Sequence, residues 1–173
     1  MQLEHAIRTR RTHKAYSRKP VDRAVLDELF ELARWAPNHH VTNPWRFRVL
    51  GKRTRKQLMD LAEARQPGSA AKLQRAPTLV AVSATLGRGD PAQDREDLFA
   101  TAVAAYIVLL GAHGKGLAGY WRTVPLLDDL QGRKILGLGG NETALGLLYL
   151  GTPVQEQRVP ERADPGEYVA YLD

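Results

Sequence analysis

The longest apolar run of the chain covers residues 98–110, thirteen uncharged residues between the charged segment 94–97 and a glycine-rich exit. A helix that spans a bilayer needs about 20 apolar residues, so we expect a buried helix here and no membrane contact. We place this helix at about Ala92 to His113. Alanine and glycine recur along it, and such small residues let neighbouring backbones approach closely. The run therefore predicts the central helix of the domain, with a subunit contact as a second use of the same residues.

Shorter segments with helical or alternating periodicity surround this helix. The predicted helices run from about Gln2 to Arg10, from Asp22 to Pro37, from Thr54 through residues 58–62, just before Pro77, and over residues 126–136. The predicted strands cover residues 45–50, 78–85, 118–122 and 144–150. In the first strand Trp45, Phe47 and Val49 alternate with two arginines, which indicates one buried face. Residues 151–173 contain three prolines and predict an extended arm that adds an edge strand at residues 168–172.

Length and composition are typical of a single soluble domain, which we expect to span residues 1–173. A chain of 173 residues is long enough to bury roughly 70 % of the surface that its unfolded form exposes. The absence of cysteine excludes disulfides, thiolate catalysis and sulfur-ligated metals. The N-terminus carries Glu4 and His5 and lacks the apolar core of a signal peptide, so we expect a cytoplasmic protein.

Charge is unevenly distributed along the chain. Residues 1–75 hold 17 Lys plus Arg against 7 Asp plus Glu, whereas residues 76–173 hold 8 against 12. A basic half favours anionic ligands, which are either a nucleic acid or a phosphorylated cofactor. A solvated basic surface is the alternative interpretation for most of these charges.

The densest part of the basic half is the segment of residues 10–14, which we call the cationic segment. Arg10 and Arg11 supply guanidinium forks, Lys14 supplies a point charge, and Thr12 supplies a neutral donor. Such a set suits the terminal phosphate of a cofactor. An exposed basic turn would have the same composition, so this alternative stays open on the segment alone.

Two aromatic segments offer walls for a planar ligand. Pro44 fixes the backbone just before Trp45, although a tryptophan at a strand start is more often part of the core. Trp121, Arg122 and Thr123 end a predicted strand, and their donors suit the polar edge of a flavin, where negative charge develops on reduction. A buried strand end with an exposed arginine is the alternative for this triplet.

Other motifs are excluded by their context. The glycines of residues 114–119 fit a G-x-G-x-x-G pattern, but they follow a helix and precede a strand, the reverse of a dinucleotide-binding turn. His39 and His40 are adjacent and no third ligand stands at zinc spacing, so we expect no metal site. No nucleophile triad, carboxylate dyad or phosphate-binding loop is present in the sequence.

Five motifs in a fixed order resemble the nitroreductase family of FMN-dependent oxidoreductases, in particular its compact single-domain branch. Residues 10–16 match the opening pattern of that family, and Pro20, Ala36-Pro37 and residues 44–47 follow in family order. The alanine-rich helix, Gly116-Leu117 with residues 121–123, and residues 148–153 complete the series. The resemblance extends over almost the whole chain.

The resemblance implies an α+β fold, a mixed sheet flanked by helices, in a homodimer that exchanges C-terminal arms and holds two FMN sites at its interface. It implies roles for individual residues as well. Arg10, Arg11 and Thr12 would hold the FMN phosphate and ribityl chain, Lys14 would lie near the phosphate or the pyrimidine edge, His39 would reach the flavin from the partner subunit, and Trp121, Arg122 and Thr123 would contact the flavin. Arg162 or Arg158 would complete the phosphate site, and Arg162 is the candidate that we carry forward. Many relatives have Asn in place of Val41 and Gln in place of Asn43.

These residues lead to a functional hypothesis. NADH or NADPH would pass hydride to FMN and leave, after which a nitroaromatic, quinone or related small-molecule acceptor would take its place in a ping-pong reaction. No catalytic side chain is expected because the flavin carries the chemistry. A flavin-dependent dehydrogenase or reductase of a specific metabolite is the alternative, and a basic nucleic-acid-binding module is a remote one. We expect neither nucleic acid nor a membrane as a partner.

Overall fold

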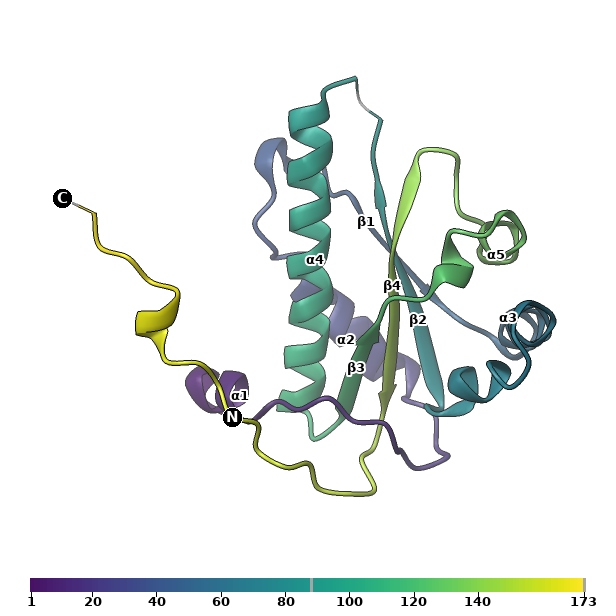
Figure 1. Cartoon of the computed structure of the whole chain (residues 1–173), viewed down its shortest axis with the longest axis horizontal. Coiled ribbons are helices and arrows are strands. Elements are labelled where there is room, and N and C mark those ends of the chain that lie inside the picture. The colour runs from purple at the N-terminus through teal and green to yellow at the C-terminus, as the bar shows by residue number, and fades with distance from the viewer. Residues whose placement is uncertain (88, 173) are drawn as a thin grey trace.

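The computed structural model describes residues 1–87 and 89–172 and contains one four-stranded sheet with helices on both faces (Figure 1). The α-helices are α1 (Leu3–Thr9), α2 (Arg23–Ala33), α3 (Lys52–Arg65), α4 (Pro91–Gly114) and α5 (Leu130–Leu136); the strands are β1 (Trp45–Val49), β2 (Thr78–Thr85), β3 (Ala118–Arg122) and β4 (Glu142–Gly151); the short 3₁₀-helices are η1 (His39–Val41), η2 (Ala70–Gln74), η3 (Pro125–Leu127) and η4 (Pro165–Glu167). The expected α+β class is confirmed.

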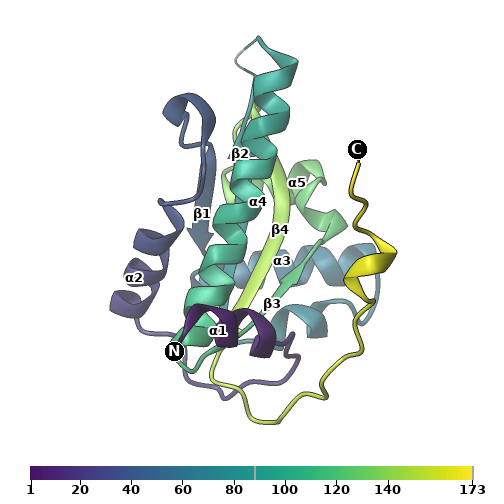
Figure 2. The same ribbon diagram turned by 90° about the vertical axis from the view of Figure 1, so that its left-hand side faces the viewer.

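The strands lie in the order β1-β2-β4-β3, and each neighbouring pair is antiparallel. The parallel pairing of this sheet is an isolated bridge between Thr12 and Gly119, at the outer edge of β3. Two cores result. One, which includes Leu29, Val108 and Leu148, lies under α2 and α4. The other, which includes Leu58 and Tyr149, lies under α3 and α5, on the opposite face of the sheet (Figures 1 and 2).

Helix α4 is the predicted central helix, and its small residues do allow close approach. A Cβ atom built on Gly111 would lie 2.9 Å from Leu32 Cδ1 and 3.1 Å from Leu29 Cδ2, so α4 and α2 are in direct contact there. Asp90 caps the helix by accepting a hydrogen bond from Ala92 N at 2.8 Å. By length and composition alone α4 would suffice to cross a membrane, but one face of it is buried on the sheet, as in the core helices of water-soluble proteins. Its outer face exposes Phe99, Val103 and Tyr106.

Three predicted boundaries are wrong, and each has a local cause. Helix α3 begins before Thr54 because Gly51 caps it with its own carbonyl, which accepts from Arg55 N. The predicted helix 126–136 is divided into η3 and α5, since Asp129 accepts hydrogen bonds from two backbone N–H groups and starts a new helix. Helix α2 ends at Ala33, before the expected stop at Pro37.

The strand β1 and the C-terminal arm also differ from expectation. Val49 is 48 % exposed, so the alternation that starts at Trp45 fails at the end of β1. The predicted edge strand at residues 168–172 does not form within this chain, where Tyr171 and Leu172 are almost fully exposed. The arm leaves the body of the molecule as an extended segment with one turn, η4, which Asp164 and Glu167 stabilise through a capping box (Figure 1).

A partly buried ion pair joins β1 to the start of β4, across β2. Arg48 forms a two-pronged contact with Glu142, at 2.8 Å from Nη1 to Oε2 and 2.7 Å from Nη2 to Oε1, and Ser83 donates a further hydrogen bond to Oε2 at 2.5 Å. Burial by itself raises the pKa of Glu142, but the hydrogen bonds from Arg48, Ser83 and the Gly139 N–H outweigh it and lower that pKa to about 2. The charge of Arg48 is therefore neutralised by a carboxylate of the same chain.

Candidate functional site

The cationic segment crosses the open edge of β3. It follows α1 directly, with Arg10 as the C-cap of that helix. Thr12 bridges Gly119, and His13 N donates to Gly119 O at 3.4 Å. Since β3 is the last strand of the sheet, its outer edge is available for this contact. The fold thereby holds the predicted phosphate-binding residues against the strand that carries Trp121 and Arg122.

Four arginines line a cavity of about 320 Å³, which we call the arginine cavity. They come from both ends of the chain: Arg8, Arg10 and Arg11 from α1 and the cationic segment, and Arg162 from the arm. The Arg10 guanidinium lies over the Tyr106 ring at 5.7 Å, and Arg11 Nη1 donates to two backbone carbonyl groups, at 2.6 and 2.9 Å. Within residues 1–87 and 89–172, no carboxylate pairs with any of these guanidinium groups. Their charge is left for a ligand.

Two histidines beside the arginine cavity add little charge to it. Burial lowers the pKa of His13, and the neighbouring charges of His113 and Arg10 lower it further. Burial likewise lowers the pKa of His113, with added contributions from Arg10, His5 and Arg11. His113 Nε2 lies 2.8 Å from Thr9 Oγ1, a hydrogen bond that a neutral ring can make. The positive potential of the cavity therefore comes from its arginines.

The predicted triplet at the end of β3 is divided between the two faces of the sheet. Trp121 packs on the α4 side, where its Nε1 donates to Leu145 O at 2.9 Å. Arg122 lies on the opposite side, with Nη1 at 3.4 Å from the Tyr149 hydroxyl, and Thr123 is exposed. Side chains alternate along a strand, and so do the directions of the backbone polar groups. Since Gly119 O points to the open edge, the N–H and C=O of Trp121 point there too.

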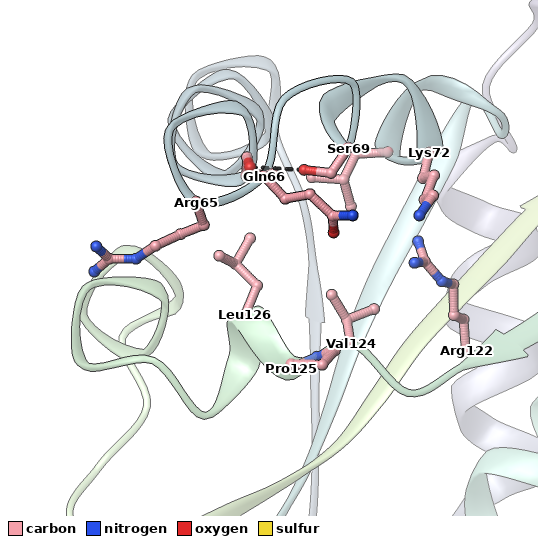
Figure 3. Close-up of a pocket in the computed structure, with 10 residues that line it drawn as sticks. Arg65, Gln66, Ser69, Lys72, Arg122, Val124, Pro125 and Leu126 are labelled. Carbon is pink, nitrogen blue, oxygen red and sulfur yellow. Dashed lines mark hydrogen bonds between the residues drawn. The ribbon is translucent and has the colours of Figure 1, made fainter.

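Arg122 opens into a second cavity, of about 150 Å³, between η2, η3 and the end of α3 (Figure 3). Lys72 of η2 also lines it, and Figure 3 shows the ends of Lys72 and Arg122 pointing toward one another. Arg65 turns away and pairs with Asp129 at 2.8 Å. The sequence interpretation missed Lys72, although a single cation in the otherwise uncharged segment 70–74 was an available signal. Two facing cations without a carboxylate between them suit an anionic or electron-rich group of a ligand.

His39 lies at the other end of α4 from the arginine cavity. Its Nδ1 is 2.7 Å from Glu96 Oε2, and its ring stacks on that of His40 with the centroids 3.8 Å apart. Glu96 and Tyr106 are ten residues apart on one helix, about 15 Å along its axis. Figures 1 and 2 show α1 beside the C-terminal end of α4 and the loop of residues 38–43 near its N-terminal half. One chain by itself does not bring His39 to the predicted phosphate site.

The loop that carries His39 is strained and tightly bonded. His40, Val41 and Asn43 have φ angles of 55°, 52° and 48°. For a β-branched residue such as Val41 this region is unfavourable, at a cost of about 1–3 kcal/mol. Asn38 ties the loop together: its Oδ1 accepts from Asn43 N at 2.6 Å and its Nδ2 donates to Thr42 Oγ1 at 2.7 Å. An Asn at position 41 would relieve this strain.

The remaining predicted residues take separate positions. Lys14 is exposed and lines neither cavity. Arg158 is exposed too and does not line the arginine cavity, whereas Arg162 does. Arg10, Arg11 and Arg162 are thus brought together, with Thr12 following directly in the chain. His39 and Arg122 lie at two other places around α4 and β3.

Comparison with known proteins gives concordant matches. The family model described as "Nitroreductase family" matches residues 7–152. The protein YfhC of Bacillus subtilis, which carries a provisional NAD(P)H nitroreductase name, is 28 % identical over 173 aligned residues, 92 % of this chain and 89 % of that protein. The crystal structure of a nitroreductase-like protein from Bacillus cereus superposes with a TM-score of 0.89 at 23 % identity and covers 100 % of this chain and 97 % of its own. An NADPH:FMN oxidoreductase from Vibrio harveyi, solved in complex with NAD⁺, superposes with a TM-score of 0.84 at 16 % identity and covers 99 % of this chain and 77 % of its own.

Proposed function

Because this chain belongs to the nitroreductase family, we propose that it is an FMN-dependent NAD(P)H oxidoreductase that reduces nitroaromatic, quinone or related small-molecule acceptors. The observation that carries the proposal is the arginine cavity, whose guanidinium groups have no acid of their own among the described residues and lie beside an open strand edge. The Vibrio harveyi neighbour, an NADPH:FMN oxidoreductase with the same fold, supports the choice of cofactor and electron donor.

The arginine cavity fits the phosphate of FMN by its chemistry. Arg10, Arg11 and Arg162 offer guanidinium donors, and the hydroxyl of Thr12 follows directly in the chain. A hydrogen bond to a charged group contributes about 1.5–3 kcal/mol, so two or three of them supply a large part of micromolar binding. Bound FMN supplies hydride transfer, from NADH or NADPH and then to the acceptor. The residues of the cavity hold and orient it.

The open edge of β3 fits the flavin ring and its polar edge. The backbone N–H and C=O of Trp121 point to that edge and can pair with the donor and acceptor atoms of a pyrimidine ring. Arg122 and Lys72 bring two positive charges to the end of the same strand, where they would stabilise the negative charge of the reduced ring (Figure 3). Thr123 and Lys14 are both exposed, and we include them in the proposed set of flavin contacts.

A homodimer explains the exposed face of α4. Glu96, Phe99, Val103 and Tyr106 recur at intervals of three or four residues and so share one face, on which Phe99 is 63 % exposed. A two-fold axis perpendicular to α4 would pack this stripe against its own copy with the two helices antiparallel. The Glu96 end of one protomer, with His39, would then meet the Tyr106 end of the other, where the arginine cavity lies. Each flavin would be held by two subunits.

The C-terminal arm belongs to the same proposal. Tyr168, Tyr171 and Leu172 are exposed on a segment that leaves the body of its own chain. Apolar side chains on such a segment gain by covering a second protomer, so we propose that the two arms are exchanged in the dimer. Residues 1–173 would then act as one FMN-binding domain, in the cytoplasm, without nucleic acid or membrane as a partner.

The reaction needs one binding slot over the flavin, which the nicotinamide and the acceptor would occupy in turn. A ping-pong sequence follows, because the first product has to leave before the second substrate enters. The absorption spectrum of the purified protein tests the cofactor directly, and a titration with FMN followed by flavin fluorescence gives its affinity. A colourless monomer that binds no added FMN would contradict the proposal.

A further inference from the structure

His39 and Glu96 form a polar pair that the proposed cofactor contacts do not explain. The carboxylate holds Nδ1 at 2.7 Å, and one residue further along α4 Asp97 Oδ1 accepts from Thr42 Oγ1 at 2.5 Å. Two consecutive residues of α4 thus fix the same loop. Within the described part of the chain Nε2 of His39 has no hydrogen-bond partner, and the ring is 62 % exposed. A ring whose Nδ1 is held by a carboxylate presents Nε2 to whatever lies opposite.

The reaction of the proposed enzyme consumes a proton at the acceptor. A quinone takes up two electrons and two protons to become a hydroquinone, and a hydride brings both electrons but one proton only. The guanidinium groups of the arginine cavity do not deprotonate, and burial lowers the pKa of His13 and His113, which disfavours the charged forms of both rings. These groups are therefore poor donors of the second proton.

We propose that His39 is the proton donor of the acceptor half-reaction in the site of the partner subunit, and that Glu96 is its positioning residue. This inference rests on the proposed function, since it requires the antiparallel pairing of two α4 helices around the flavin. As hydride reaches the acceptor, the Nε2–H bond of the His39 imidazolium breaks and an O–H bond forms on an acceptor oxygen. The ring is left neutral and takes a proton from water, while Glu96 stays ionised.

A purely structural role for the pair explains less. His39 and Glu96 are 62 % and 45 % exposed, and exposed ion pairs contribute little to stability because water and salt screen them. The loop is already held by Asn38 and by the contact of Thr42 with Asp97. Among the described residues, the ionisable groups in contact with the His39 ring are Glu96 on α4 and His40 in the same turn. Of these, Glu96 bonds the ring directly.

The experiment compares His39→Gln and Glu96→Gln with a matched control, His40→Asn, which changes the stacked neighbour and keeps a residue that tolerates a positive φ. Reduced, FMN-saturated protein is mixed with benzoquinone or with ferricyanide in a stopped-flow instrument. Ferricyanide accepts electrons without a proton, so the ratio of the two rates isolates proton delivery. General acid catalysis contributes roughly 10²–10⁴-fold. We expect the ratio to fall about 100-fold in His39→Gln and about tenfold in Glu96→Gln, and to stay at the wild-type value in His40→Asn.

A further measurement, made without the flavin, separates this inference from the proposed function. The Nδ1 proton resonance of His39 in the FMN-free protein should move upfield in Glu96→Gln. An unchanged rate ratio in His39→Gln, or an equal loss in His40→Asn, overturns the role of His39 even if FMN binds and is reduced normally. Failure of the protein to bind FMN at all overturns the proposed function instead.

Discussion

Two groups of arginines in this molecule have opposite surroundings. Arg48 belongs to β1 and is joined to Glu142, at the start of β4, by two hydrogen bonds of 2.7 and 2.8 Å. Arg10, Arg11 and Arg162 converge on a cavity with no carboxylate partner in the described parts of the chain. An arginine that stabilises the fold has a carboxylate partner within the chain. An arginine without such a partner can bind an anionic ligand, and it then contributes to ligand affinity rather than to the stability of the fold.

The largest effect that tests this contrast is the loss of Glu142. Glu142→Ala should lower the free energy of unfolding by about 2–3 kcal/mol, below the about 3–5 kcal/mol of a fully buried pair, because it leaves the Arg48 charge without its partner in a partly buried site. Urea unfolding followed by circular dichroism measures it. Glu156→Ala, an exposed glutamate of the arm, is the matched control and should change stability by less than about 0.5 kcal/mol. If Glu142→Ala lost as little unfolding free energy as Glu156→Ala, the ion pair of Arg48 and Glu142 would contribute nothing to stability.

The same pair predicts a pH dependence. The pKa of Glu142 is lowered in the fold from the ordinary value of 4.5 to about 2, so the unfolded state binds the proton more readily. Stability from this group is therefore complete above about pH 4.5 and is lost as pH falls toward 2, by roughly 3 kcal/mol in total. Glu142→Gln should flatten the curve of unfolding free energy between these pH values. If the curves of the two proteins run parallel, other carboxylates cause the acid sensitivity.

Substitutions in the arginine cavity should have the opposite effect, a loss of FMN affinity without a loss of stability. Arg10→Ala should weaken FMN binding by about 1–3 kcal/mol, roughly ten- to a hundredfold in Kd, because a charge-assisted contact to phosphate is lost. Its free energy of unfolding should stay within about 0.5 kcal/mol of wild type, since no carboxylate depends on this side chain. Flavin fluorescence titration and urea unfolding of the same samples measure both.

Arg162→Ala and Arg158→Ala provide a matched pair for that measurement. Both residues lie on the arm, but only Arg162 lines the arginine cavity. The first substitution should weaken FMN binding by about 1 kcal/mol or more and the second by less than about 0.3 kcal/mol. Equal losses of FMN affinity in the two variants would mean that the overall charge of the arm matters, and not the position of Arg162 in the arginine cavity.

The smallest expected effect concerns the backbone of the loop at residues 38–43. Val41→Asn should raise the free energy of unfolding by about 1 kcal/mol, because Asn tolerates the φ of 52° better than a β-branched residue. Val25→Asn on α2, where the φ is helical, should destabilise instead. A thermal shift of the right sign in the first variant, with no gain in the second, distinguishes relief of strain from a general benefit of polar residues. A loss of stability in Val41→Asn would indicate that the exposed valine makes contacts that outweigh its strain.

Much of the fold could be predicted because it follows local pattern. The apolar run at residues 98–110 lies in α4, and the mostly apolar residues of 78–85 form the strand β2, buried on both faces. Thr54 misled the prediction because a threonine before an apolar repeat looks like a cap, whereas the carbonyl of Gly51 starts α3 without any side chain. Lys72 was missed since its importance depends on Arg122, which joins it only through the packing of η2 against the end of β3.

The sequence by itself determined the periodic elements, the excess of positive charge in the first half, and the absence of cysteine chemistry, because each of these depends on residues close together in the chain or on composition alone. Only the tertiary structure decided which cations have an acid. Arg48 meets Glu142 and Arg10 meets Arg162 through the pairing of strands and the path of the arm. Coulombic interaction depends on distance in space and on burial, and no local pattern of residues contains either quantity.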